Sequence, residues 1–134
     1  MKTGIVRLFL NYYSMFNKEE YSKGLVQLAN WQWTVTIRPN YKVSATSGFN
    51  LIQRLAKKLR SIIFYTIEKD RDSSHKHIHL LLDKQTSKEE VYKSLKIKKD
   101  TVLYSEPIES PEAISSYILK HINNNSEHNI CLDK

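Results

Sequence analysis

The 134-residue sequence contains little cysteine, glycine or proline. Its single cysteine, Cys131, excludes an internal disulfide and a zinc finger, and is typical of a reducing compartment such as the cytoplasm. Three glycines and three prolines exclude collagen-like and low-complexity chains. No glycine-rich loop ends in Lys-Ser or Lys-Thr, so the sequence carries no ATPase or helicase motor of its own.

Long apolar runs are also missing. No stretch approaches the roughly 20 apolar residues that span a bilayer. Arg7 interrupts the apolar start of the sequence, and no cleavage site of small residues follows it. We therefore expect neither a membrane anchor nor a secretory signal, and a cytoplasmic location.

Positive charge is what the sequence has in excess. Lysine and arginine number 21 against 14 acidic residues, which gives a net charge of +7. This balance favours a polyanionic partner, either nucleic acid or an acidic membrane surface, although a charge of this size also serves solubility. The length and a hydrophobic content of 40% fit one packed domain over residues 1–134.

Hydrophobic periodicity predicts the order of helices and strands. Alternation predicts strands at 31–38, 62–70, 75–83 and 101–106, and helical spacing predicts helices at 49–60, 86–96 and 110–122. Ser87 and Ser110 are the expected N-caps. The order predicts an α+β fold: a ferredoxin-like, RRM-like split βαβ antiparallel sheet with an additional C-terminal helix, its core at residues 31–124. Residues 1–30 form an extension, in which we expect 11–16 and 24–30 to pack as a helix or an edge strand.

Two histidines and a carboxylate share one face of the predicted hairpin. Because alternate residues of a strand point the same way, His77 and His79 lie side by side while Ile78 enters the core. Antiparallel pairing places Glu68 of the preceding strand beside them. His75 is in the same phase, but a His75 and His77 pair requires Lys76 to face the core.

This set of two imidazoles and one carboxylate suits a divalent ion such as Mn²⁺ or Mg²⁺, and also Zn²⁺, Co²⁺ or Fe²⁺. Histidines on a strand are also often structural, held by hydrogen bonds. We predict a metal site formed by Glu68, His77 and His79.

The last predicted helix carries Tyr117 and Lys120. Residues three apart lie on one helical face, so a phenol and an ammonium can act at one place. Alone, the pair is better explained by a tyrosine that fills the apolar stripe and a solvated lysine.

In this order, HKHIHLLL followed by SYILKHI resembles the paired motifs of the HUH endonucleases, a His-hydrophobic-His strand followed by a helix with Tyr-x-x-Lys. Glu68 is placed like the acidic ligand of the viral and plasmid replication initiators in this family. The segment WTVTIRP is loosely similar to their first-strand motif. The resemblance covers roughly residues 31 to 124.

The resemblance implies a single-tyrosine nickase for single-stranded DNA, active at an origin or hairpin in rolling-circle replication of a virus or plasmid. Tyr117 would attack the scissile phosphate and form a 5′-phosphotyrosine link that a later hydroxyl reverses. Lys120 would stabilise charge on the phosphate or assist the leaving group. A host helicase and polymerase are expected partners, and nicking on two strands is compatible with a homodimer.

For such a substrate, we expect the excess of positive charge to bind the DNA backbone. The expected contacts are Arg38, Lys57, Lys58, Arg60 and Lys76. Trp33 and Tyr65 are assigned to the core by their alternation, so stacking of a base on either is not expected.

Three alternatives remain open. A single-tyrosine insertion-sequence transposase also has the His-hydrophobic-His strand, but these enzymes usually lack the acidic ligand and carry a glutamine after the tyrosine on the same helix. A non-catalytic RRM-like module would display exposed aromatics on the middle strands, where this sequence has Glu68, His77 and His79. A two-histidine, one-carboxylate iron oxygenase matches the ligand types alone.

Overall fold

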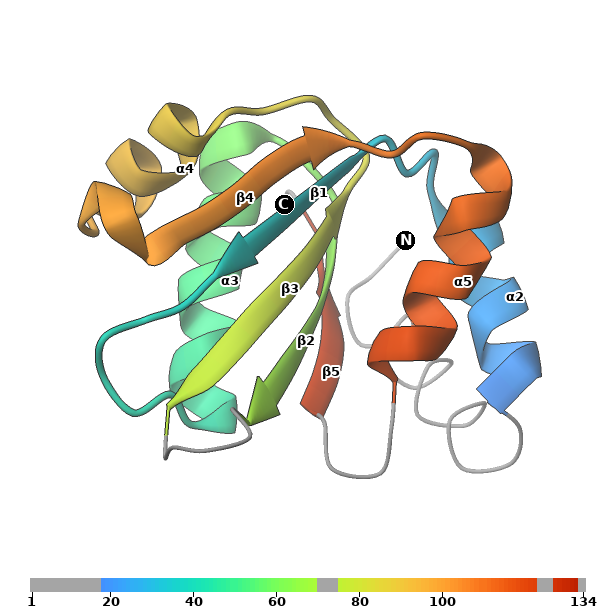
Figure 1. Cartoon of the computed structure of the whole chain (residues 1–134), viewed down its shortest axis with the longest axis horizontal. Coiled ribbons are helices and arrows are strands. Elements are labelled where there is room, and N and C mark those ends of the chain that lie inside the picture. Colours follow the sequence, from blue (N-terminus) through green and yellow to red (C-terminus); the bar gives the residue numbers. More distant parts are fainter. Residues whose placement is uncertain (1–17, 70–74, 123–126, 133–134) are drawn as a thin grey trace.

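The computed structural model describes residues 18–69, 75–122 and 127–132 (Figure 1). A three-residue 3₁₀ turn, Lys99–Thr101, precedes β4. The helices and strands follow one another as α2 (Lys18–Leu28), β1 (Trp33–Ile37), α3 (Ala45–Leu59), β2 (Ile63–Lys69), β3 (Lys76–Leu82), α4 (Lys88–Leu95), β4 (Val102–Pro107), α5 (Pro111–His121) and β5 (Glu127–Cys131).

The strands form one five-stranded antiparallel sheet in the order β4-β1-β3-β2-β5. The predicted α+β class is confirmed, as are the four predicted strands and three predicted helices within a few residues of their bounds. The expected extension contributes a helix, α2. The expected packing of residues 11–16 and the predicted turn at 71–74 lie outside the described residues.

The fifth strand was not predicted. β5 pairs with β2 along Ile63↔Cys131 to Ile67↔Glu127 and so widens the sheet beyond four strands. The chain therefore does not end its folded part with α5, as expected, but returns to the sheet edge. This places α5 between two segments that are both anchored in the sheet.

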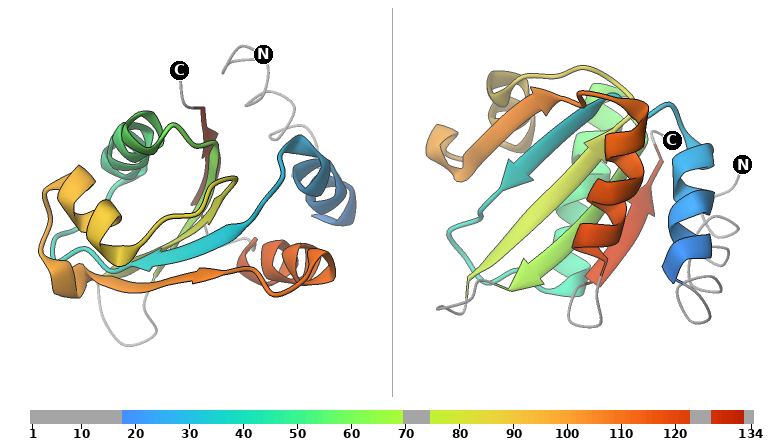
Figure 2. Two further views of the ribbon diagram at one scale, coloured as in Figure 1. Left: turned by 90° about the horizontal axis from the view of Figure 1, so that it is seen from above. Right: turned by 45° about the vertical axis from the view of Figure 1, so that its right-hand side comes forward.

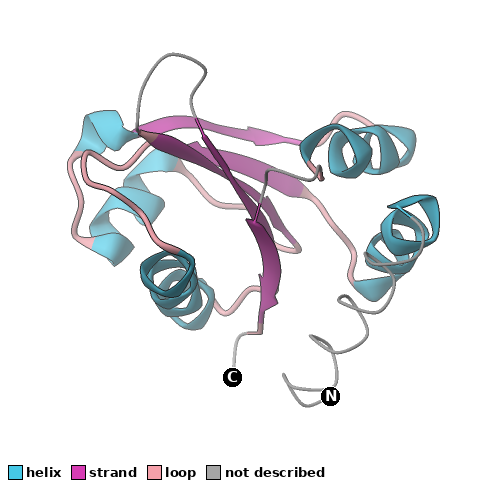
Figure 3. Cartoon of the chain, turned by 90° about the horizontal axis from the view of Figure 1, so that it is seen from below, coloured by secondary structure: helices cyan, strands magenta, loops and turns pink. Residues whose placement is uncertain are grey.

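Helices cover both faces of the sheet (Figures 2 and 3). On one face α3 and α4 pack against the residues that alternation assigned to the core, among them Ile67, Ile78 and Leu80. On the other face α5 and α2 pack against Phe64, Leu81 and Ile130. The face that carries Glu68 and His79 is thus half apolar and covered by the tyrosine helix, rather than a wholly polar surface.

The helix starts follow from side-chain caps. Ser110 Oγ accepts a hydrogen bond from the backbone N–H of Ala113, and Pro111 occupies the first turn of α5, as predicted. Ser87 caps α4 in the same way. α3 begins earlier than predicted because Ser44 and Ser47 form a reciprocal capping box.

Within the described part of the chain, the helices are all too short or too polar to cross a membrane.

Ile118 anchors α5 on the sheet and gives a test of this packing. It is fully buried among the apolar residues between α5, α2 and the sheet. We expect Ile118→Ala to lower the free energy of unfolding by about 2–4 kcal/mol, because the methyl groups are lost and a cavity remains. Ser116→Ala, on the exposed side of the same helix, should change it by less than about 0.5 kcal/mol. Urea unfolding of both variants measures the difference, and equal effects would contradict this packing.

Candidate metal centre

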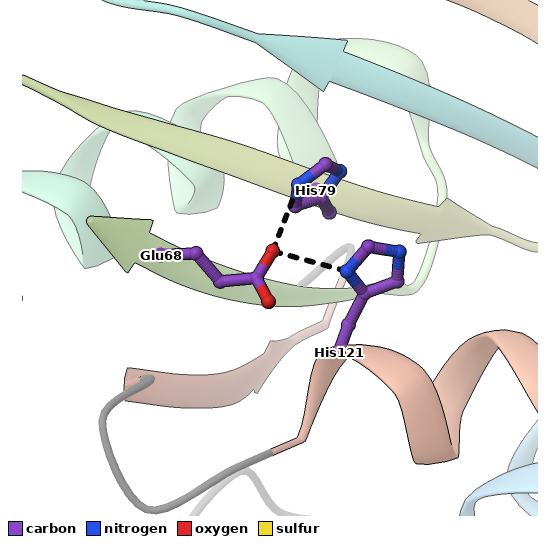
Figure 4. Close-up of side chains that lie close together, drawn as sticks. All are labelled: Glu68, His79 and His121. Atoms are coloured by element: carbon purple, nitrogen blue, oxygen red, sulfur yellow. Dashed lines mark hydrogen bonds and ion pairs between the residues drawn. The ribbon is translucent and has the colours of Figure 1, made fainter. Parts of the chain in front are cut away.

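Three elements bring Glu68, His79 and His121 together beneath α5 (Figure 4). Glu68 comes from β2, His79 from β3 and His121 from the last turn of α5. One carboxylate oxygen, Glu68 Oε2, accepts hydrogen bonds from His79 Nε2 at 2.8 Å and from His121 Nδ1 at 3.0 Å. The two imidazoles stack with their ring centroids 4.1 Å apart.

The spacing of the three donor atoms fits a divalent ion. All three lie within 4.8 Å of one another. Ligands at about 2.1 Å from an ion and at right angles to each other are about 3.0 Å apart, which matches the two observed nitrogen to oxygen distances. Glu68, His79 and His121 can therefore hold a metal ion, with the fourth and further positions left for other ligands.

Burial and charge act against each other at the carboxylate. The side chains of Glu68, His79 and His121 are 21%, 20% and 11% exposed. Burial raises the pKa of Glu68, but the hydrogen bonds and charges of His121 and His79 outweigh it and lower the pKa to about 2. The group is thus a carboxylate, the form that ligates metals, throughout the physiological range.

Thr36 orients one of the imidazoles. It lies opposite His79 across β1 and β3, and its hydroxyl is 3.3 Å from His79 Nδ1. A hydroxyl both donates and accepts, so Thr36 can satisfy this nitrogen whether or not His79 Nε2 carries a proton. Outer partners of this kind fix the ring orientation of a metal-binding histidine.

Tyr117 lies one helical turn before His121, and their rings are in tilted contact with centroids 4.4 Å apart. Its hydroxyl is buried and has no hydrogen-bond partner among the described residues. Burial raises the pKa of the Tyr117 phenol above its ordinary value, and the negative charge of Glu68 raises it further. The hydroxyls of Ser22, Thr66 and Thr86 are also buried without a partner, so what distinguishes Tyr117 is its contact with His121 of the cluster.

The structure groups Glu68 and His79 with His121, where the sequence predicted His77 as the third residue. Glu68 and His77 are directly opposite in the strand register, as expected. The Glu68 carboxylate reaches diagonally to His79 instead, and the His77 ring lies 6.1 Å from that of His79. His121 was not among the ligands predicted from the sequence. Its spacing of four from Tyr117 was the available signal, since it puts both side chains on one helix face.

Lys120 and most of the predicted DNA contacts lie outside this cluster. Lys120 is exposed on α5. Lys57 and Lys58 lie in the last turn of α3 and Arg60 is its C-cap, and α3 packs on the opposite face of the sheet. Lys76 shares the strand phase of Ile78 on that same face.

Arg38 is the exception. It directly follows Ile37, whose partner in β3 is Ile78, so it lies at the end of β1 near His77. With His75 and Asp100 it lines a hollow of about 290 Å³. Trp33 is partly buried and Tyr65 is buried, as predicted.

Comparison of the chain with protein-family models, with curated proteins and with solved structures finds no match. The chemistry of the site therefore carries the functional argument.

The choice between the two ligand sets can be tested by titration with Mn²⁺. We expect His79→Ala and His121→Ala each to weaken Mn²⁺ binding at least about 100-fold, because each removes a direct ligand. His77→Ala should weaken it less than about threefold. Calorimetry or Mn²⁺ electron paramagnetic resonance provides the affinities. A loss with His77→Ala and none with His121→Ala would restore the ligand set predicted from the sequence.

The affinity for Mn²⁺ should fall as the pH is lowered from 8 to 5. Protons compete with the ion for His79 Nε2 and His121 Nδ1, whereas Glu68, with its pKa lowered to about 2, stays ionised across this range. Glu68→Gln should bind Mn²⁺ more weakly at every pH, because it loses the carboxylate ligand. A wild-type affinity that does not change with pH would exclude imidazole ligands.

Proposed function

We propose that the protein is a metal-dependent single-stranded DNA nickase and joining enzyme of the HUH type, with Tyr117 as nucleophile. One observation carries the proposal: the buried, unpartnered hydroxyl of Tyr117 lies on the helix that also supplies His121 to the metal-binding cluster. A nucleophile and a cation site are thus held together by one rigid element.

The arrangement of the strands supports the same proposal. The order β4-β1-β3-β2, with α3 after β1 and α4 after β3, agrees with a ferredoxin-like split βαβ core to which α2, α5 and β5 are added. In the HUH endonucleases that the sequence resembles, a His-hydrophobic-His strand is followed by a helix that bears the tyrosine. β3 occupies the middle of this sheet, and α5 packs on the face that carries His79.

The proposed reaction is a transesterification. The Tyr117 oxygen forms a bond to phosphorus as the bond from phosphorus to the 3′ oxygen breaks. The phenol proton is released, and the 3′ oxygen takes up a proton to leave as a hydroxyl. The product is a 5′-phosphotyrosine link, which a later 3′-hydroxyl reverses. A phenol is a poor nucleophile at its ordinary pKa, so the phosphate must be positioned and its charge offset.

Glu68, His79 and His121 would hold the divalent ion, Mn²⁺ or Mg²⁺, that supplies positive charge to the non-bridging phosphate oxygens. Thr36 keeps the His79 ring in place, and the apolar packing of α5 keeps Tyr117 out of bulk water. Lys120, exposed beside the tyrosine, is available to a phosphate that binds at the surface of α5.

In this proposal the partner is a single-stranded origin or hairpin, with a helicase and polymerase of the host needed for replication. The net charge of +7 favours association with DNA. Of the five basic residues predicted to contact DNA, Arg38 is the one that lies near His77. Lys57, Lys58 and Arg60, across the sheet, would contact DNA only beyond the cleavage site.

A covalent adduct is the test of this function. Wild-type protein incubated with a labelled pool of single-stranded oligonucleotides and Mn²⁺ should give a DNA-shifted band on a denaturing protein gel, and EDTA should abolish it. Tyr117→Phe should give none, because the nucleophilic oxygen is absent. Tyr41→Phe, an exposed tyrosine of the β1–α3 connection, should behave as wild type. Binding without an adduct would favour a non-catalytic nucleic-acid module.

A single-tyrosine transposase is the second candidate, and His121 favours it. In those enzymes the tyrosine helix carries a glutamine after the tyrosine, and here that helix supplies a member of the cluster. The adduct assay separates the two. Loss of the adduct in both Glu68→Ala and His121→Ala is expected if both residues hold the ion. Loss in Glu68→Ala alone would favour a replication initiator, and loss in His121→Ala alone would favour a transposase.

A further inference from the structure

A hollow of about 400 Å³ opens beside Tyr117 on the face of the sheet that carries the metal-binding cluster. Most of its lining residues belong to the end of β4, the start of α5 and the connection between them, a path of the chain that can be followed in Figure 1. This volume is in the lower part of the range for small-molecule pockets, about 300–1,000 Å³. The hollow is lined by Thr34, Glu106, Pro107, Ile108, Glu109, Ala113, Ile114 and Tyr117.

The walls are apolar and the charges are acidic. Pro107, Ile108 and Ile114 offer flat aliphatic surface, and among the described lining residues the charged ones are Glu106 and Glu109. Carboxylates beside a DNA backbone repel it, so a nucleic-acid site at this place needs a reason to carry them. The Watson–Crick edge of an unpaired base gives such a reason, because Asp and Glu accept hydrogen bonds from base amino groups.

Glu106 is the better placed of the two carboxylates. It belongs to β4 and pairs with Thr34 of β1, which fixes its backbone, whereas Glu109 lies in the connection to α5. Alternation puts Glu106 on the same face as Tyr104, whose partner Thr36 faces His79. A group held by a strand is more strongly oriented than one on a loop.

We propose that this hollow receives one unpaired base next to the scissile phosphate, and that Glu106 selects guanine there. Guanine presents two parallel donors, N1–H and the N2 amino group, to the two oxygens of one carboxylate. Adenine and cytosine present one amino donor beside a ring nitrogen that repels the second oxygen, and thymine presents a single N3–H between two carbonyls. The specificity assignment rests on the proposed single-stranded DNA substrate.

Binding in EDTA tests the assignment without cleavage. The probes are a fluorescein-labelled oligothymidylate of about 15 nucleotides and the same strand with one central dG, dA or dC. The dG strand should bind at least about fivefold more tightly than the oligothymidylate, with the dA and dC strands between them. Fluorescence anisotropy measures the four affinities.

Glu106→Gln should reduce the guanine preference to less than about twofold, because one acceptor oxygen becomes a donor amide. Its affinity for oligothymidylate should stay equal or rise, since a negative charge is removed. Glu112→Gln is the matched control: it makes the same charge change at an exposed site of α5 outside the hollow and should keep the preference. Circular dichroism checks that both variants are folded.

Equal affinities of the wild-type protein for the dG strand and the oligothymidylate would overturn the assignment. So would a guanine preference that survives both Glu106→Gln and Glu109→Gln, and so would the absence of binding to any strand. The two proposals fail separately. A Tyr117 adduct without a guanine preference would leave the nickase standing and remove the base pocket. A guanine preference without an adduct would leave the base pocket standing and remove the nickase.

Discussion

The site depends on one carboxylate oxygen that accepts hydrogen bonds from two histidines on two different elements. Glu68 Oε2 joins β2 to His79 of β3 and to His121 of α5, so the helix is fixed to the sheet through a charged contact as well as an apolar one. Partly burying a carboxylate is costly unless it is paired. The two imidazoles provide that pairing. Their hydrogen bonds and charges lower the pKa of Glu68 by more than burial raises it.

The sequence was sufficient to predict strands β1 to β4, helices α3 to α5 and the phase of the hairpin, because these depend on local periodicity. Ile67, Ile78 and Leu80 face α3 and α4 as alternation requires, which leaves Glu68 and His79 on the other face. Which histidine the carboxylate would reach was not predictable. Direct and diagonal neighbours across a hairpin are both within range of a glutamate, and only the approach of α5 decides between them. His121 was missed for the same reason: its ligand role requires a contact across 53 residues of sequence.

β5 illustrates a second limit of local patterns. It has five residues and no clear alternation, and it exists as a strand because the edge of β2 is available to it. Its consequence for the site is indirect. The buried hydroxyl of Tyr21 in α2 contacts His128 Nδ1 of β5 at 2.7 Å, and burial lowers the pKa of that histidine, which favours the neutral acceptor form. The N-terminal helix is thereby tied to the last strand, and α5 packs against α2 over the sheet.

The excess of positive charge is not concentrated at the candidate site. Three of the basic residues singled out in the sequence lie at the C-terminal end of α3 on the far face, while the hollow beside Tyr117 is acidic. In the proposed reaction this matters for the nucleophile, because burial and the charge of Glu68 both raise the pKa of Tyr117. A cation held by Glu68 would offset that charge. In the proposed reaction an ion at this site would remove the contribution of Glu68 to the raised pKa of Tyr117, while the larger contribution of burial would remain.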